Sequence, residues 1–199
     1  MRGRDVLALT AAAGGLVAAG ALTIALGRAR RSGAAALALA HTDDLTGLLN
    51  RRGWKTACRA RHTGRAWIVL VADADGFKHH NDAFGHLAGN RLLVDLARRL
   101  SAVCGPGALV ARYGGDEFTA LLPVAVAAPG LAGRIAERVT AALAVPAGVS
   151  VAVEVTCSVG AALLAPGEHI DAALQRADAA MYAAKAARAT APLPALRAA

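Results

Sequence analysis

The stretch Tyr113–Phe118, with the sequence YGGDEF, places two glycines and two carboxylates directly before an alternating apolar run. Glycine tolerates positive φ and lets a ligand approach the backbone, so the pair predicts a tight β-hairpin turn. The run 118–122 predicts the returning strand. Carboxylates at the tip of such a hairpin are suited to hard divalent cations. Considered alone, the four residues GGDE fit a plain surface turn equally well.

A second acidic segment lies upstream, where the β-branched run Trp67–Val71 leads into residues 72–78, with the sequence ADADGFK. The run predicts a buried strand that presents carboxylates at its C-terminal end, where ligands bind in open α/β sheets. Two carboxylate clusters on neighbouring strands can hold a pair of Mg²⁺ ions about 4 Å apart. Lys78 adds a cation for phosphate. Together these features indicate phosphoryl or nucleotidyl transfer on a nucleoside triphosphate.

Five blocks of the sequence resemble, in the same order, those of the GGDEF-domain diguanylate cyclases. Members of that family condense two GTP molecules into cyclic di-GMP and release pyrophosphate. The resemblance extends from His41 to Ala189. The blocks are residues 43–52 (DDLTGLLNRR), 73–86 (DADGFKHHNDAFGH), 112–118 (RYGGDEF), 156–160 (TCSVG) and 177–185 (ADAAMYAAK). The resemblance implies a five-stranded mixed sheet like that of nucleotidyl cyclases and polymerase palms.

Helices and strands alternate along this part of the chain. The predicted helices are 51–61, 77–84, 88–101, 131–144 and 170–188, and the predicted strands are 67–72, 109–113, 117–122, 150–155 and 158–164. This order predicts an α/β domain with a central mixed sheet covered by helices. Asn50 or Thr46 is available to cap the first of these helices.

The resemblance implies a catalytic and metal-binding role for two acidic positions. Asp73, Asp116 and the backbone carbonyl of Ala74 match ligands of two Mg²⁺ ions, with Mn²⁺ as an alternative. Asp116 also matches the residue that deprotonates the attacking ribose 3′-hydroxyl, and Glu117 beside it supports metal or hydrogen-bond geometry. The implied catalytic residues are therefore Asp116, Glu117 and Lys78. Metal-assisted attack of the 3′-oxygen on the α-phosphate, with loss of pyrophosphate, suits this set of residues.

The resemblance also implies a GTP site. The residues at matching positions are Gly76, Phe77, Lys78, Asn81, His86, Asn90, Gly114, Gly115 and Lys185. The backbone amides of Gly76 and Phe77 and the two lysines match contacts to phosphate, whereas Asn81, His86 and Asn90 match contacts to guanine.

Three positions depart from the family pattern. Asn90 stands where the family usually has an acid, which accepts both the N1 and N2 hydrogens of guanine. An amide oxygen loses one such hydrogen bond, at a cost of about 0.5 to 3 kcal/mol, so selectivity for GTP is expected to be weaker. Ala189 replaces a family arginine, and Arg188 lies one residue early. Residues 105–108 (GPGA) lack the arginine and aspartate of the family's product-inhibition site, which argues against feedback inhibition there.

The N-terminal part predicts a membrane anchor. Val6 to Leu26 carries no charge and is long enough to cross about 30 Å of hydrocarbon as a helix. A secretory signal peptide is the alternative, but the apolar run is longer than usual for one. The predicted organisation is a flank at 1–5, a transmembrane helix at 6–26, a short basic connector at 27–40, a GGDEF domain at 41–189 and a flexible tail at 190–199.

The arginines predict the orientation of this anchor. Arg28, Arg30 and Arg31 follow the apolar run and outweigh Arg2 and Arg4 before it, which places the catalytic domain in the cytoplasm. We therefore expect a single-pass protein of the cell inner membrane.

The amino-acid composition further limits the partners and the cellular compartment expected for this protein. The 199 residues suit one domain with an extension, and the net charge of +8 at first suggests a nucleic-acid partner. No aromatic residues interleave with the arginines to stack bases, so we expect no nucleic-acid binding. Cys58, Cys104 and Cys157 form no Cys-x-x-Cys pair and predict thiols of a reducing compartment rather than a disulfide or metal site.

The leading hypothesis is a membrane-anchored diguanylate cyclase that works as a homodimer, because each half-site holds one GTP and the two must face each other. Two alternatives remain open at this point. One is a degenerate domain that binds GTP as a regulatory module, and the other is a cyclase with relaxed purine specificity.

Overall fold

The structure is a computed structural model that describes residues 40–61, 64–145 and 155–189. The chain divides into two compact units, Met1–Ala40 and His41–Ala199. The predicted transmembrane helix 6–26, the flank before it, nearly all of the basic connector and the tail 190–199 lie outside the described residues. Among the helices in the described ranges, none is long and apolar enough to span a membrane.

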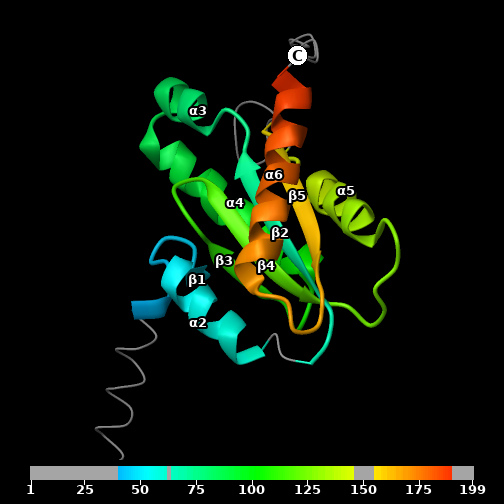
Figure 1. Cartoon of the computed structure of the whole chain (residues 1–199). Helices are drawn as coiled ribbons and strands as arrows, with labels where there is room; N and C mark the ends of the chain where they lie inside the picture. Colours follow the sequence, from blue (N-terminus) through cyan, green and yellow to red (C-terminus); the bar gives the residue numbers. More distant parts are fainter. Residues whose placement is uncertain (1–39, 62–63, 146–154, 190–199) are drawn as a thin grey trace, which may run out of the picture. The chain divides into compact units, whose positions relative to one another are not determined.

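A five-stranded mixed sheet forms the centre of the second unit, in the order β1-β3-β4-β2-β5 (Figure 1). The strands are β1 (Leu49–Asn50), β2 (Trp67–Ala74), β3 (Leu109–Arg112), β4 (Glu117–Pro123) and β5 (Cys157–Leu164). β1 pairs with β3 in parallel, and the other neighbouring strands are antiparallel. Every residue of β2 is buried, in agreement with its continuous apolar run, and this strand carries Asp73 near its end.

The sequence pattern does not predict β1, and it places a strand at 150–155 instead. Residues 150–154 lie outside the described ranges, and Val155 pairs with Val145 only in an isolated bridge. β1 contains two residues, which is too short for an alternating pattern to be recognised. Its pairing with Ala111 and Arg112 of β3 makes it a strand, so only the tertiary structure identifies it.

Helices cover both faces of the sheet (Figure 1). α4 (His86–Cys104) and α5 (Leu131–Leu143) share one apolar core with the β2 and β4 residues on their side, and α3 (Phe77–Phe84) packs against α4. α2 (Arg51–Arg61) and α6 (Ile170–Ala189) share the second core with the alternate residues of those strands. Successive side chains of a strand point to opposite faces, so β2 and β4 contribute to both cores.

The helix boundaries follow from local signals that the sequence contains. Asn50, one of two predicted caps, accepts a hydrogen bond from the Gly53 amide at 2.9 Å, whereas the Thr46 hydroxyl bonds to Asp43. α4 begins at His86, two residues earlier than predicted, because Gly85 separates it from α3 with φ 80° and ψ 160°.

The predicted hairpin is confirmed, but its glycines do not have the predicted conformation. β3 and β4 pair antiparallel, and the Tyr113 amide donates to the Glu117 carbonyl at 2.7 Å. Neither Gly114 nor Gly115 has a positive φ, so the predicted conformational reason is wrong. A Cβ at Gly114 would lie 2.8 Å from Oε2 of Glu117, so a larger residue there would displace the end of the Glu117 side chain.

The three cysteines are thiols, as predicted. Cys58 and Cys157 are buried and Cys104 is partly buried. Burial raises the pKa of each thiol to about 12. Such thiols stay protonated and unreactive at neutral pH, so they act as small apolar side chains.

Candidate active site

The two acidic segments of the sequence meet at one end of the sheet. Asp73 of β2 lies directly opposite Glu117 of β4 in the strand register. The Ala74 amide donates to the Asp116 carbonyl at 3.3 Å, which joins the end of β2 to the hairpin tip. Asp73 is 8% exposed, and Asp116 is partly buried. The arrangement therefore brings together three carboxylates from two segments that lie more than 40 positions apart in the sequence.

Negative charge accumulates at this end of the sheet. Burial and the neighbouring Asp73 raise the pKa of Asp116, although Lys185 and Arg112 oppose the shift. Burial raises the pKa of Glu117 as well, and so do the charges of nearby carboxylates. Carboxylates held together in this way favour a bound cation, which would offset their repulsion.

The residues present fit a magnesium ion. Mg²⁺ is usually bound through one or two carboxylates, with substrate phosphates and water as the remaining ligands. Asp73 and Asp116 supply carboxylates, and Ala74 lies at the end of β2 beside Asp116. Within the described residues, no group of three or more His, Cys, Asp or Glu side chains is placed to hold a metal. A cation here would therefore also need backbone or substrate oxygens.

Lys185 of α6 reaches the same carboxylates. Its Nζ lies 2.5 Å from Oδ1 of Asp73, and this hydrogen bond raises the pKa of the lysine. The predicted phosphate lysine and the predicted metal ligand are thus in direct contact. Lys78, the other predicted phosphate lysine, is exposed at the start of α3.

Asp75 is held by a network that sequence reasoning missed. Its carboxylate accepts hydrogen bonds from Thr156 Oγ1 at 2.7 Å and Ser158 Oγ at 2.6 Å. Arg188 completes the network with Nη1 at 3.1 Å from Oδ2 of Asp75. Arg188 therefore binds the loop after β2, a role that its displacement from the family position did not suggest. The alternating polar residues of the block TCSVG were the available signal.

The segment after β2 forms a turn that suits phosphate. Gly76 precedes α3 with φ 69° and ψ 20°, a left-handed conformation that glycine adopts without strain. Phe77 and Lys78 are the first two residues of the helix. Backbone amides in the first turn of a helix have no intrahelical acceptor and point toward an anion placed there. Gly76, Phe77 and Lys78 therefore occupy positions where a phosphate group can bind.

The predicted base-binding residues lie at and around the junction of α3 and α4. His86 is the first residue of α4, Asn90 lies one turn later, and both are exposed. Asn81 of α3 is partly buried, and its Oδ1 is fully buried with no hydrogen-bond partner within the described ranges. A Cβ at Gly89 would lie 1.8 Å from this oxygen, so Gly89 makes room for Asn81. Sequence reasoning missed this role of Gly89.

Arg112 connects the hairpin to the beginning of the domain. Its Nη1 lies 3.2 Å from the Asp43 carboxylate, and its Nε and Nη2 donate to the Gly115 carbonyl at 2.9 and 2.7 Å. Burial raises the pKa of Asp43, but hydrogen bonds from Thr46 and the Arg112 charge lower it by more. Arg112 therefore fixes the backbone immediately before Asp116, while Gly114 and Gly115 complete the loop.

This combination of fold and site defines a class of protein: an α/β domain whose paired carboxylates, lysine and glycine turn can bind a nucleoside triphosphate with a divalent metal. The family described as "Diguanylate cyclase, GGDEF domain" matches residues 40–190. The chain belongs to this family.

Known relatives agree with this placement. Diguanylate cyclase DgcM from Escherichia coli is 38% identical over 151 residues, which cover 73% of this chain and 36% of DgcM. Diguanylate cyclase TpbB from Pseudomonas aeruginosa is 40% identical over 155 residues, which cover 73% of this chain and 35% of TpbB. The chain thus spans about a third of the length of these two relatives.

A solved structure shows the same fold. The coiled coil and GGDEF domain of DgcB from Caulobacter crescentus, in complex with c-di-GMP, superposes with a TM-score of 0.68. The two are 30% identical, and the match covers 83% of this chain and 91% of that structure.

Proposed function

We propose that this chain is a diguanylate cyclase that condenses two GTP molecules into cyclic di-GMP and pyrophosphate. The convergence of Asp73, Asp116 and Lys185 at the end of β2 carries the proposal. The two carboxylates can bind a divalent cation and accept a proton, and the lysine can bind phosphate. Nucleotidyl transfer requires all three. Membership of the family and the relatives named diguanylate cyclase support the same activity.

The site residues have different roles in the reaction. Asp116 accepts the proton of the ribose 3′-hydroxyl of one GTP, whose oxygen then bonds to the α-phosphorus of the other GTP. The bond from that phosphorus to the bridging oxygen breaks, and pyrophosphate leaves. Glu117 lies beside Asp116 and supports its position. Lys78 and Lys185, with the amides of Gly76 and Phe77, hold the phosphates and offset their charge.

The proposal includes two bound Mg²⁺ ions, with Mn²⁺ as an alternative. Asp73, Asp116 and the Ala74 carbonyl would hold them. When bound, such ions neutralise phosphate charge and favour ionisation of the 3′-hydroxyl.

We propose a homodimer for the reaction. Cyclic di-GMP contains two phosphodiester bonds that join the same two nucleotides, and each domain offers one set of the acids. Two copies that face each other therefore supply both attacks. Residues 6–26 would anchor each copy as a single-pass protein of the inner membrane with the domain in the cytoplasm, and their uncharged apolar sequence supports this. Recovery of the full chain in the soluble fraction after cell lysis would contradict the anchor.

Asn90 favours a second candidate function, a cyclase with relaxed purine specificity. Asn90 is exposed in the first turns of α4, close in sequence to His86, so its amide is accessible to a bound base. An amide can accept from the guanine edge or donate to the adenine edge, whereas a carboxylate only accepts. ATP could therefore replace one GTP.

The deciding experiment incubates the full chain in detergent or nanodiscs with Mg²⁺ and equimolar GTP and ATP, followed by mass analysis of the products. Cyclic di-GMP as the main product would support the proposal, and a mixed dinucleotide would favour the second candidate. Binding of GTP without any cyclic product would overturn both and leave a regulatory GTP-binding module. Asp116→Asn, which keeps the size and removes the charge, is the matched control that should make no product.

A further inference from the structure

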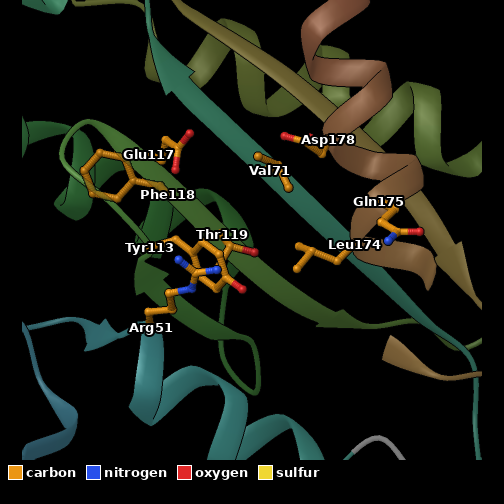
Figure 2. A pocket seen from close by; sticks show the side chains of 9 residues that line it. All are labelled: Arg51, Val71, Tyr113, Glu117, Phe118, Thr119, Leu174, Gln175 and Asp178. Atoms are coloured by element: carbon orange, nitrogen blue, oxygen red, sulfur yellow. The ribbon is translucent and has the colours of Figure 1, made fainter. Parts of the chain in front are cut away.

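A cavity of about 220 Å³ lies on the face of the sheet covered by α2 and α6 (Figure 2). Thr119 of β4 lines its floor, and Gln175 and Asp178 line it from α6. Figure 2 shows Arg51 against the Tyr113 ring at one side, with Glu117 farther along β4 toward the hairpin. The cavity therefore borders the start of α2, the hairpin and α6.

Arg51 occupies an unfavourable position for a cation. It is the first residue of α2, and the first turn of this helix contains no acidic residue. The N-terminal end of a helix carries a partial positive charge, which repels an arginine there. Arg52 shares this unfavourable position, so a reason that is specific to Arg51 has to come from its contacts. The surroundings of Arg51 supply such a reason.

The first contact of Arg51 is with the hairpin. Its guanidinium carbon lies 4.7 Å from the centroid of the Tyr113 ring, within the range of a cation–π interaction. Trp54, almost one turn later in α2, meets the same ring edge-on at 5.6 Å between centroids. The Tyr113 amide in turn donates to the Glu117 carbonyl. The first turn of α2 therefore holds the side chain of the residue that closes the hairpin.

Arg51 also interacts electrostatically with the acids that line the cavity. Among the described residues that line the cavity, Arg51 alone is positively charged, and it shares the cavity with the Glu117 and Asp178 carboxylates. Its charge opposes the repulsion among the acids around Glu117. Lys185 and Arg112, which lie nearby, are already paired with Asp73 and Asp43.

We propose that Arg51 is a positioning residue that holds the hairpin and its carboxylates in the arrangement used by the reaction. The inference rests on the proposed function. Arg51 acts through the Tyr113 ring and the Glu117 carboxylate and does not touch the reacting atoms. The predicted nucleotide contacts of α3 and α4 lie on the other side of the sheet from Arg51, and the phosphate lysine Lys185 has its own partner in Asp73. Asp116 and Glu117, in contrast, belong to the hairpin that Arg51 holds. The larger effect therefore falls on turnover, and the smaller one on GTP binding.

The test compares Arg51→Met with Arg52→Met in the full chain. Arg52 is the next residue, is exposed and does not line the cavity, so its replacement removes the same charge from the same helix end. We expect Arg51→Met to lower kcat about 10-fold while KM for GTP changes less than about twofold. Arg52→Met should retain wild-type values. Arg51→Lys restores the charge without the planar group and should recover part of kcat.

A second readout does not depend on activity. Amide hydrogen exchange of Tyr113 and Gly114, measured without nucleotide, should be about two- to fivefold faster in Arg51→Met than in Arg52→Met. If the wild-type chain makes no cyclic product, faster exchange would still support the positioning role while the proposed function fails. Equal exchange in the two variants, or an equal effect of both on kcat, would overturn the positioning role and leave the proposed function standing.

Discussion

His80→Leu should stabilise the protein, because His80 is a buried polar residue whose ring nitrogens have no polar partner in the described part of the chain. The side chain is 4% exposed, and neither ring nitrogen has a hydrogen-bond partner among the residues that the structure describes. Its ring packs against Phe84 with 5.0 Å between centroids, which an aliphatic side chain can replace. A buried unsatisfied polar group costs about 1 to 3 kcal/mol. Leucine should therefore raise the free energy of unfolding by roughly 1 to 2 kcal/mol at pH 8, after allowance for imperfect packing.

The gain from leucine should increase as the pH falls. Burial lowers the pKa of His80 below the ordinary histidine value of about 6.5, which applies to the unfolded chain. Between these two pKa values the unfolded state binds a proton that the folded state does not, so wild-type stability falls as the pH falls below about 6.5. His80→Leu has no titrating side chain at this position, so its stability does not fall in this way. The difference between the two proteins should widen by up to about 1.4 kcal/mol per pH unit in this window.

Urea unfolding of the full chain in detergent, followed by circular dichroism at pH 8 and pH 5.5, measures both effects. His79→Leu is the matched control, because His79 is exposed on the same helix and should change the stability little. A His80→Leu variant that is less stable than wild type at pH 8 would refute the reasoning. So would a difference between the two proteins that does not change with pH.

Three other substitutions test the site. Asp116→Ala should abolish turnover and leave the free energy of unfolding equal or slightly higher, since the residue lies in the hairpin loop and its loss removes repulsion with Asp73; residual activity near wild type would refute its assignment as metal ligand and base. Asn90→Asp should sharpen the preference for GTP over ATP, and an unchanged ratio of products would show that Asn90 does not read the base. Gly89→Ala should weaken GTP binding about 10-fold or more, measured by calorimetry, because its Cβ collides with the Asn81 oxygen. Unchanged affinity in Gly89→Ala would mean that Asn81 does not contact the nucleotide.

Local patterns were sufficient for much of the fold. The apolar run of β2 and the glycine pair before β4 predicted two central strands and the hairpin between β3 and β4. These signals depend on neighbouring residues, so a single sequence contains them in full. β1 was not predicted because two residues are too few to show a periodic pattern. The positive φ predicted for Gly114 and Gly115 was wrong because the backbone between β3 and β4 turns without it.

By itself, the sequence determined which chemical groups this protein has: the acids after β2 and in the hairpin, the lysines, and the glycine that opens α3. Only the tertiary structure decided which of them meet. Lys185 reaches Asp73 across 112 positions, Arg112 reaches Asp43 across 69, and Arg51 lies on the hairpin tyrosine. The physical reason is that strand order and helix packing, rather than sequence separation, set these distances, and a local pattern contains no information about either.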